Sequence, residues 1–158
     1  MIIKRFRLLD WWLNRKRSGI RRLSPAEGIL LISSGGLGDT VLFAQVVERF
    51  LDLAKDGEPV TVVLRSDAMK MAFAMPPGIQ AMGVDFNRLR QDLNYRRGIT
   101  DSLFNAHYRL VVHTDYLRHP DLDEALVAAA QAPEAIAMEP RRWDKYDSRL
   151  RNNRRLYS

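Results

Sequence analysis

Short apolar runs alternate along the chain with segments in which apolar residues have a helical spacing. The clearest run is 29–32, which is followed by a turn rich in glycine. It is too short for a buried helix, so it predicts a strand buried on both faces, as in a parallel sheet. Runs rich in β-branched or other apolar residues predict further strands at 60–64, 79–84, 108–113 and 135–138.

Helical patterns fill the segments between these strands. After the first strand, apolar residues at positions 43, 46, 47, 50, 51 and 54 fall on one face of a helix. Further helices are predicted at 68–74, 86–95, 100–104 and 122–130, with a break at 96–98 between the second and the third. Because strands and helices alternate, the sequence predicts an α/β fold with a Rossmann-like parallel sheet and helices on both faces.

Charge divides the chain into three segments. Residues 1–27 hold eight Lys or Arg and two acids, residues 28–140 hold ten and fifteen, and residues 141–158 hold seven and two. We therefore predict a basic amphipathic segment at 1–27, a Rossmann-like domain at 28–140 and a basic C-terminal segment at 141–158. The C-terminal segment is expected not to pack when the chain is alone, because its basic side chains repel one another.

The N-terminal segment has the pattern of an amphipathic helix over 2–17. Its apolar face holds Ile2, Phe6, Leu9 and Leu13, with Trp12 beside it. Basic residues border this face at positions 4, 5, 7, 15, 16 and 17, with two more at 21 and 22. Such a helix suits either an anionic membrane surface or packing on its own domain or a partner, and the pattern favours neither. Nucleic-acid binding is the weakest interpretation, because no nucleic-acid motif accompanies the charge.

Composition excludes several classes of protein. The chain has no cysteine, which rules out disulfides and thiolate metal sites and favours a reducing compartment. No apolar run approaches the roughly 18 residues of a membrane span. Asp10 and Asn14 interrupt the apolar part of the N-terminus, which argues against a secretory signal. We expect a cytoplasmic protein, with peripheral attachment to the inner face of the inner membrane as the variant that the basic N-terminus suggests.

The glycine-rich turn after the first strand is the strongest candidate site. Glycines at 35, 36 and 38 are expected to let the backbone turn sharply and bring a ligand close to the main chain. Asp39 stands where the N-cap of the following helix is expected. A strand, a glycine turn and a helix N-terminus together predict a polar pocket that tolerates anions at the carboxyl edge of the sheet.

Nucleotide-binding motifs match this turn poorly. A P-loop ends in Gly-Lys-Ser/Thr, whereas Gly38 is followed by Asp39 and Thr40. A dinucleotide fingerprint read from Gly36 has Val41 in place of its third glycine, and no acidic residue ends the second strand.

Acidic and histidine residues near the fourth strand suggest metal ligands only weakly. Asp121 and Asp123 precede a helix, where the dipole alone favours acids. His113 with Asp115, and His119 with Asp121, do not supply three ligands at a helical or hairpin spacing. We therefore predict hydrogen-bonded or surface histidines and no metal.

Residues 29–47 resemble the opening strand, turn and helix of the family 9 glycosyltransferases, the heptosyltransferases of lipopolysaccharide synthesis. The similarity rests on an apolar strand, a small-residue turn, Leu37-Gly38-Asp39 and an apolar helix. It extends more faintly through 108–112 and 132–137, and residues 152–157 are similar to the basic stretch that leads to the family's second domain.

The resemblance implies the N-terminal half of a GT-B fold, in which a second Rossmann-like domain carries most of the nucleotide-sugar site. It implies inverting, metal-independent transfer of a heptose or related sugar from a nucleoside diphosphate to a lipid-linked or other glycan acceptor, without a cofactor. Asp39 would be the general base. Ser34, Gly35, Gly36, Leu37, Gly38 and Thr40 would bind substrate.

The resemblance covers only the first of the family's two domains. Without the second domain, which would bind the donor, we expect the isolated chain to be inactive. Two alternatives stay open at this point. One is a noncatalytic module that docks to a membrane or a protein through its basic ends. The other is a single-domain nucleotide-binding protein that uses the glycine turn.

Overall fold

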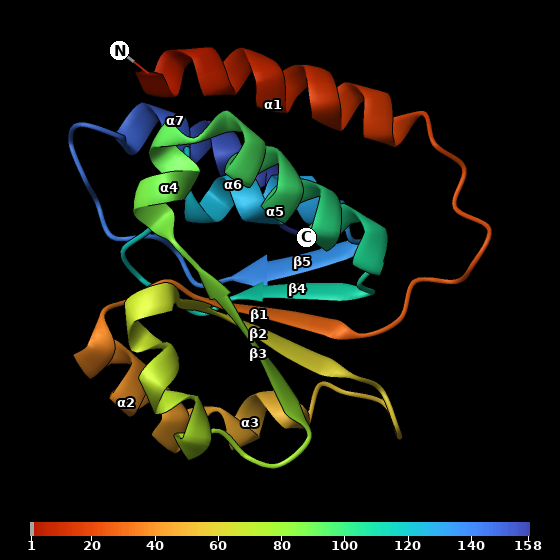
Figure 1. The fold of residues 1–158 in the computed structure, drawn as a ribbon, viewed down its shortest axis with the longest axis vertical. Coiled ribbons are helices and arrows are strands. Elements are labelled where there is room, and N and C mark those ends of the chain that lie inside the picture. Colours follow the sequence, from red (N-terminus) through yellow and green to blue (C-terminus); the bar gives the residue numbers. More distant parts are fainter. Residues whose placement is uncertain (1) are drawn as a thin grey trace.

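A five-stranded, all-parallel sheet forms the centre of the molecule, with strand order β3-β2-β1-β4-β5 (Figure 1). The computed structural model describes the backbone of residues 2–158 and the side chains of residues 6–158. The strands are β1 (Ile29–Ser33), β2 (Val60–Arg65), β3 (Ile79–Val84), β4 (Leu110–His113) and β5 (Glu134–Ala137). All the predicted strands are present with small differences at their ends, and the Rossmann-like α/β fold is confirmed.

Helices cover both faces of the sheet. One face carries α2 (Leu37–Val46), α3 (Glu48–Leu51) and the 3-10 helix η1 (Ser66–Ala74). The other carries α4 (Phe86–Gln91), α5 (Leu93–Ala106) and α6 (Asp123–Ala130), with α7 (Asp147–Asn153) and the 3-10 helix η2 (Arg154–Leu156) on the same side (Figure 1). Helix α1 (Ile2–Ser18) lies outside this second layer, against α4 and α6. No helix in the described part of the chain is long and apolar enough to cross a bilayer.

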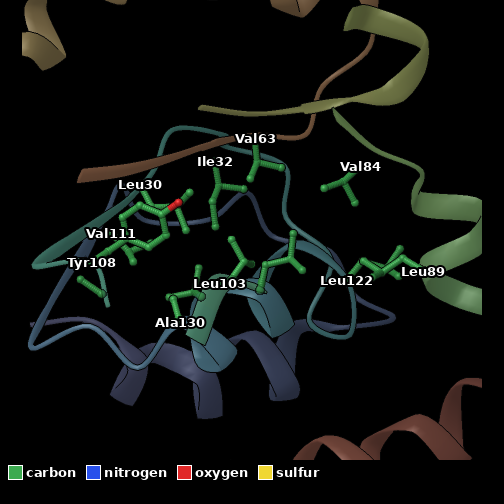
Figure 2. Close-up of a cluster of buried hydrophobic side chains, with 13 residues drawn as sticks. Leu30, Ile32, Val63, Val84, Leu89, Leu103, Tyr108, Val111, Leu122 and Ala130 are labelled. Atoms are coloured by element: carbon green, nitrogen blue, oxygen red, sulfur yellow. The ribbon is translucent and has the colours of Figure 1, made fainter. Parts of the chain in front are cut away.

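The central strand β1 divides its side chains between two cores. Leu30 and Ile32 are fully buried toward α5 and α6, and Figure 2 shows them with side chains from neighbouring strands and helices. Ile29 and Leu31 are fully buried on the opposite face, in a core that includes Phe43 from α2. Burial on both faces explains why the run 29–32 is apolar without alternation.

Two predicted helix boundaries are wrong. The helix expected around 43–54 is divided into α2 and α3, and Val46 of the predicted apolar stripe is exposed. The break expected at 96–98 falls instead at Asp92, whose side chain accepts a hydrogen bond from Tyr95 N and caps α5. Arg96 lies inside α5 because it is buried and forms an ion pair with Asp10 of α1.

One face of α1 packs on the domain. Phe6 and Leu13 are buried, and the buried Arg17 donates hydrogen bonds to Thr100 and Asp101 of α5. Of the two interpretations of the amphipathic pattern, packing on its own domain is therefore correct for this face. The side chains at 2–5, which include Ile2, Lys4 and Arg5 of that pattern, lie outside the described residues.

The prediction that the C-terminal segment does not pack is wrong. Leu150 of α7 is buried, Asn153 Nδ2 donates to Glu124 Oε2 at 2.6 Å, and Ser158 N donates to Ala135 O at 2.8 Å. Arg149 forms an ion pair with Asp121. Repulsion among the basic residues is overcome because acidic side chains of the domain face them.

Asp121 joins both ends of the chain to the domain. Its buried carboxylate accepts hydrogen bonds from Arg7 of α1 and Arg149 of α7, while its backbone oxygen accepts one from Arg96. Burial alone would raise the pKa of Asp121, but the hydrogen bonds from Arg149 and Arg7 outweigh burial and lower it.

We predict that Asp121→Asn lowers the free energy of unfolding by about 3 kcal/mol at neutral pH, since it leaves two arginines without their carboxylate. A carboxyl with a lowered pKa stabilises the fold above its unfolded-state pKa and loses this effect as pH falls, so the difference between variant and parent should shrink below about pH 4. Urea unfolding across pH measures both effects. Asp67→Asn, which removes an exposed carboxylate, is the control. Equal stability of the two variants would contradict the role of Asp121.

Candidate functional site

The candidate site lies at the carboxyl edge of the sheet, where β1 and β4 are neighbours. From β1 the chain continues to β2 on one side of the sheet, and from β4 it continues to β5 on the other. Ligands of open parallel sheets bind at such a switch point, because the two connections diverge and leave a crevice. The segments after β1 and β4 therefore form the two sides of the candidate crevice.

Ser34, directly after β1, is held by the segment after β4. Asp115 Oδ2 accepts hydrogen bonds from Ser34 N at 2.5 Å and from Ser34 Oγ at 2.7 Å. Burial raises the pKa of Asp115, and the opposing effects of His113 and of the Ser34 hydrogen bonds do not cancel this. The start of the predicted substrate-binding turn is thus tied to β4 through a carboxylate.

His113, Asp115 and Asp123 bring potential metal-ligand atoms within 4.8 Å of one another. The expectation that three ligands cannot be assembled here is therefore wrong, because Asp123 at the start of α6 joins His113 and Asp115. His113 Nδ1 accepts the backbone N–H of Asp115 at 3.3 Å. His113 Nε2 is hydrogen-bonded to Asp123 Oδ2 at 3.1 Å. The prediction of a hydrogen-bonded histidine is confirmed for His113.

Asp39 lies inside α2, three residues after the N-cap. The N-cap is Gly36, and Asp39 Oδ2 accepts the Gly36 N–H at 3.0 Å from the first turn of the helix. The expected N-cap position of Asp39 is therefore wrong, although its carboxylate still satisfies a backbone donor at the helix start. The Asp39 side chain is exposed at the same edge of the sheet as Ser34.

The glycine turn does not use left-handed backbone. Positive φ angles among the glycines occur at Gly28, Gly57 and Gly78 and not in the turn, so a sharp turn that requires glycine for its φ is not observed there. Gly35 is required for space. A Cβ at this position would lie 2.5 Å from Asp39 Cβ, so the missing side chain lets Asp39 fold over the turn.

The other predicted substrate-binding residues differ in their exposure. Leu37 and Gly38 are exposed, Gly36 is half-buried, and Thr40 is fully buried with Oγ1 donating to Gly36 O at 3.0 Å. Ser34 is the predicted residue that lines the adjoining cleft. Thr40 is therefore placed to stabilise α2 and not to contact a ligand.

A cleft of about 520 Å³ opens beside Ser34, with walls from the segments after β2, β3 and β4. This volume falls within the usual range for small-molecule sites. The cleft is lined by three arginines, Arg65, Arg90 and Arg118, and by Trp143 from the C-terminal segment. Sequence reasoning missed Arg90, Arg118 and Trp143. The place of Arg118 shortly after a strand end was the available signal for one of them.

Arg118 is the most unusual of these residues. It is buried, and its Nε and Nη1 have no hydrogen-bond partner. Arg118 forms a buried ion pair with Glu124, with Nε 3.3 Å from Glu124 Oε1, and the Tyr157 ring lies 5.0 Å from Arg118 Cζ. Burial raises the pKa of Glu124. Glu124 therefore balances the charge of Arg118 at the cleft wall, although two nitrogens of the guanidinium lack a hydrogen-bond partner.

His119 connects the cleft to the C-terminal segment. Its Nδ1 accepts the backbone N–H of Asp121 at 3.1 Å, and its ring contacts those of Trp143 and Tyr146, with centroids 6.2 and 4.6 Å away. Burial lowers the pKa of His119, which favours the neutral ring. The C-terminal segment thus completes one wall of the cleft.

We predict that Gly35→Ala lowers the free energy of unfolding by about 1–3 kcal/mol, because the new methyl group collides with Asp39. Gly38→Ala is the control, since a Cβ there meets no other atom within 4 Å. Urea denaturation of both variants gives the comparison. An equal cost for the two substitutions would contradict the close contact between Gly35 and Asp39.

Comparison with models of protein families and with curated proteins finds no match to this chain. Its function therefore has to be inferred from the geometry of the site and the sequence of the turn.

Proposed function

We propose that this chain is the acceptor-side domain of a GT-B glycosyltransferase, similar to the heptosyltransferases, with Asp39 as the general base. The proposal depends most on one observation. An exposed Asp39 carboxylate accepts the Gly36 N–H in the turn after β1, and this turn begins at Ser34, a residue that lines the cleft. The resemblance of the Leu-Gly-Asp turn to family 9 supplies the reaction type.

In the proposed reaction, an acceptor hydroxyl attacks the anomeric carbon of a nucleotide sugar. Asp39 takes the hydroxyl proton as the new C–O bond forms and the bond from carbon to diphosphate breaks. The nucleoside diphosphate leaves from the opposite face, so the configuration inverts. The Asp39 carboxylate accepts only one backbone N–H and keeps further lone pairs that can take a hydroxyl proton, which suits a general base. A second domain would hold the donor.

The hydrogen bonds of the turn favour this proposal over nucleotide binding by the turn itself. Sites that bind phosphate at a strand-to-helix turn use free backbone N–H groups. Here Ser34 N donates to Asp115 and Gly36 N donates to Asp39. Carboxylates of the same chain occupy these donors and would repel a phosphate. An uncharged hydroxyl is the better ligand for this part of the site.

The rest of the cleft favours an acceptor that carries negative charge. Arg65 is paired with Asp67 and Arg118 with Glu124, whereas Arg90 is exposed at the cleft and forms no ion pair among the described residues. Phosphate or carboxylate groups on a glycan would supply acceptors for the guanidinium donors of Arg90. The half-buried Trp143 offers an aromatic surface for a sugar ring. We therefore propose an anionic glycan acceptor of the lipopolysaccharide type.

In a protein that also carries a donor domain, Asp39→Asn should lower turnover by roughly 100-fold or more, the usual contribution of a general base. The amide oxygen of asparagine can still accept the Gly36 N–H, so thermal unfolding should change little. Steady-state kinetics with a nucleotide sugar and an acceptor measure the first effect. Asp56→Asn, on the exposed turn before β2, is the matched control. Near-normal turnover of the Asp39 variant would show that this residue has only a structural role.

We also predict that Arg90→Gln raises the KM for an anionic acceptor by about tenfold, the effect of losing one charge-assisted hydrogen bond. The KM for the nucleotide sugar should not change. Arg97→Gln removes an exposed arginine of α5 outside the cleft lining and is the control. An unchanged acceptor KM in the Arg90 variant would exclude the cleft as the acceptor site.

A further inference from the structure

Helix α1 presents large apolar side chains on the surface that faces away from the domain. Phe6 and Leu13 are buried against the second helix layer. Leu8, Trp11 and Trp12 are 69%, 59% and 52% exposed. Figure 1 shows α1 as the outermost element on this side of the molecule. The domain therefore does not cover these three side chains.

Each exposed indole has a cation beside it. Arg15 Cζ lies 5.8 Å from the centroid of the Trp11 ring, and Lys16 Nζ lies 5.5 Å from that of Trp12. The spacing 8, 11, 12, 15 places these residues on one side of the helix, with 16 next to them. We call Leu8, Trp11, Trp12, Arg15 and Lys16 the outer face of α1.

The charge of the outer face has one sign. The only acid of α1, Asp10, is turned toward the domain and paired with Arg96. Arg15 and Lys16 are exposed, and the exposed Arg21 follows shortly after the helix. Aromatic and aliphatic side chains surrounded by uncompensated cations are complementary to a surface that is negative outside and apolar beneath.

We propose that the outer face of α1 binds the headgroup region of an anionic lipid bilayer. Trp11 and Trp12 enter the interfacial zone, where the indole ring is favoured, while Arg15 and Lys16 bind lipid phosphates. Leu8 adds apolar area to the contact. This surface shares no residue with the cleft, so the inference goes beyond the proposed function and does not depend on it.

The charges favour a membrane over a second copy of the chain. A two-fold interface through the outer face would bring Arg15 and Lys16 of both copies together without acids between them. Attachment is peripheral, because the other face of α1 is fixed to the domain by Phe6, Leu13 and the Asp10–Arg96 ion pair. Deletion of α1 would expose these buried groups, so point variants of the outer face are the appropriate test.

The test is sedimentation of the full chain with vesicles. We expect binding to phosphatidylcholine vesicles that contain about 30% phosphatidylglycerol, and at least tenfold weaker binding to phosphatidylcholine alone. The double variant Trp11→Ser/Trp12→Ser should bind the anionic vesicles at least tenfold more weakly. Arg15→Gln/Lys16→Gln should also bind weakly and lose most of the salt dependence. Phe73→Ser, at an 82% exposed aromatic on the opposite face, is the control and should bind like the parent.

Fluorescence quenching tests whether α1 lies at the bilayer. In a Trp143→Phe background the remaining tryptophans are Trp11 and Trp12, and brominated lipids should quench their emission. Absence of binding, equal binding to neutral vesicles, or unchanged binding after removal of both indoles would each overturn the proposal. So would a dimer in solution that dissociates in the Trp11→Ser/Trp12→Ser variant, which would assign the outer face to a second copy.

Discussion

The outer parts of the structure depend on ion pairs near the carboxyl edge of the sheet. In these pairs, acidic residues of the domain bind arginines from both ends of the chain. Asp121 accepts hydrogen bonds from Arg7 and Arg149, and its neighbour Glu124 accepts one from Asn153. Burying such charges costs solvation free energy, so each partner is needed once the others are in place. The basic ends and the acidic centre of the sequence are therefore parts of one charge-balanced structure.

The loop between β4 and α6, which contains Asp121, connects this packing to the candidate site. It also carries Asp115, which accepts hydrogen bonds from Ser34, and Arg118 and His119, which line the cleft. Trp143 reaches the cleft because the C-terminal segment is fixed nearby. Changes in the loop would therefore alter stability and ligand binding together.

Helix α1 shows how one amphipathic pattern can serve two surfaces. Phe6 and Leu13 are buried against the domain, while Leu8, Trp11 and Trp12 remain exposed. Its sequence fits both packing on the domain and binding to a membrane, because a helix with apolar residues on more than one side is compatible with either. Burial of Phe6 and Leu13 shows that one face packs on the domain. The cations beside the exposed indoles are the reason for proposing that the other face binds a membrane.

The sequence by itself determined the strands, their parallel arrangement and the position of the glycine turn, because these follow from local apolar patterns and chain connectivity. It also indicated Asp39 as a candidate and His113 as a hydrogen-bonded histidine. Only the tertiary structure decided that Arg96 continues α5, that Gly35 provides space for Asp39, that Arg118 lines the cleft and that the C-terminal segment packs. These features depend on contacts between residues far apart in the chain, such as Arg96 with Asp10 and Arg149 with Asp121, and local patterns carry no information about which distant charge will be the partner.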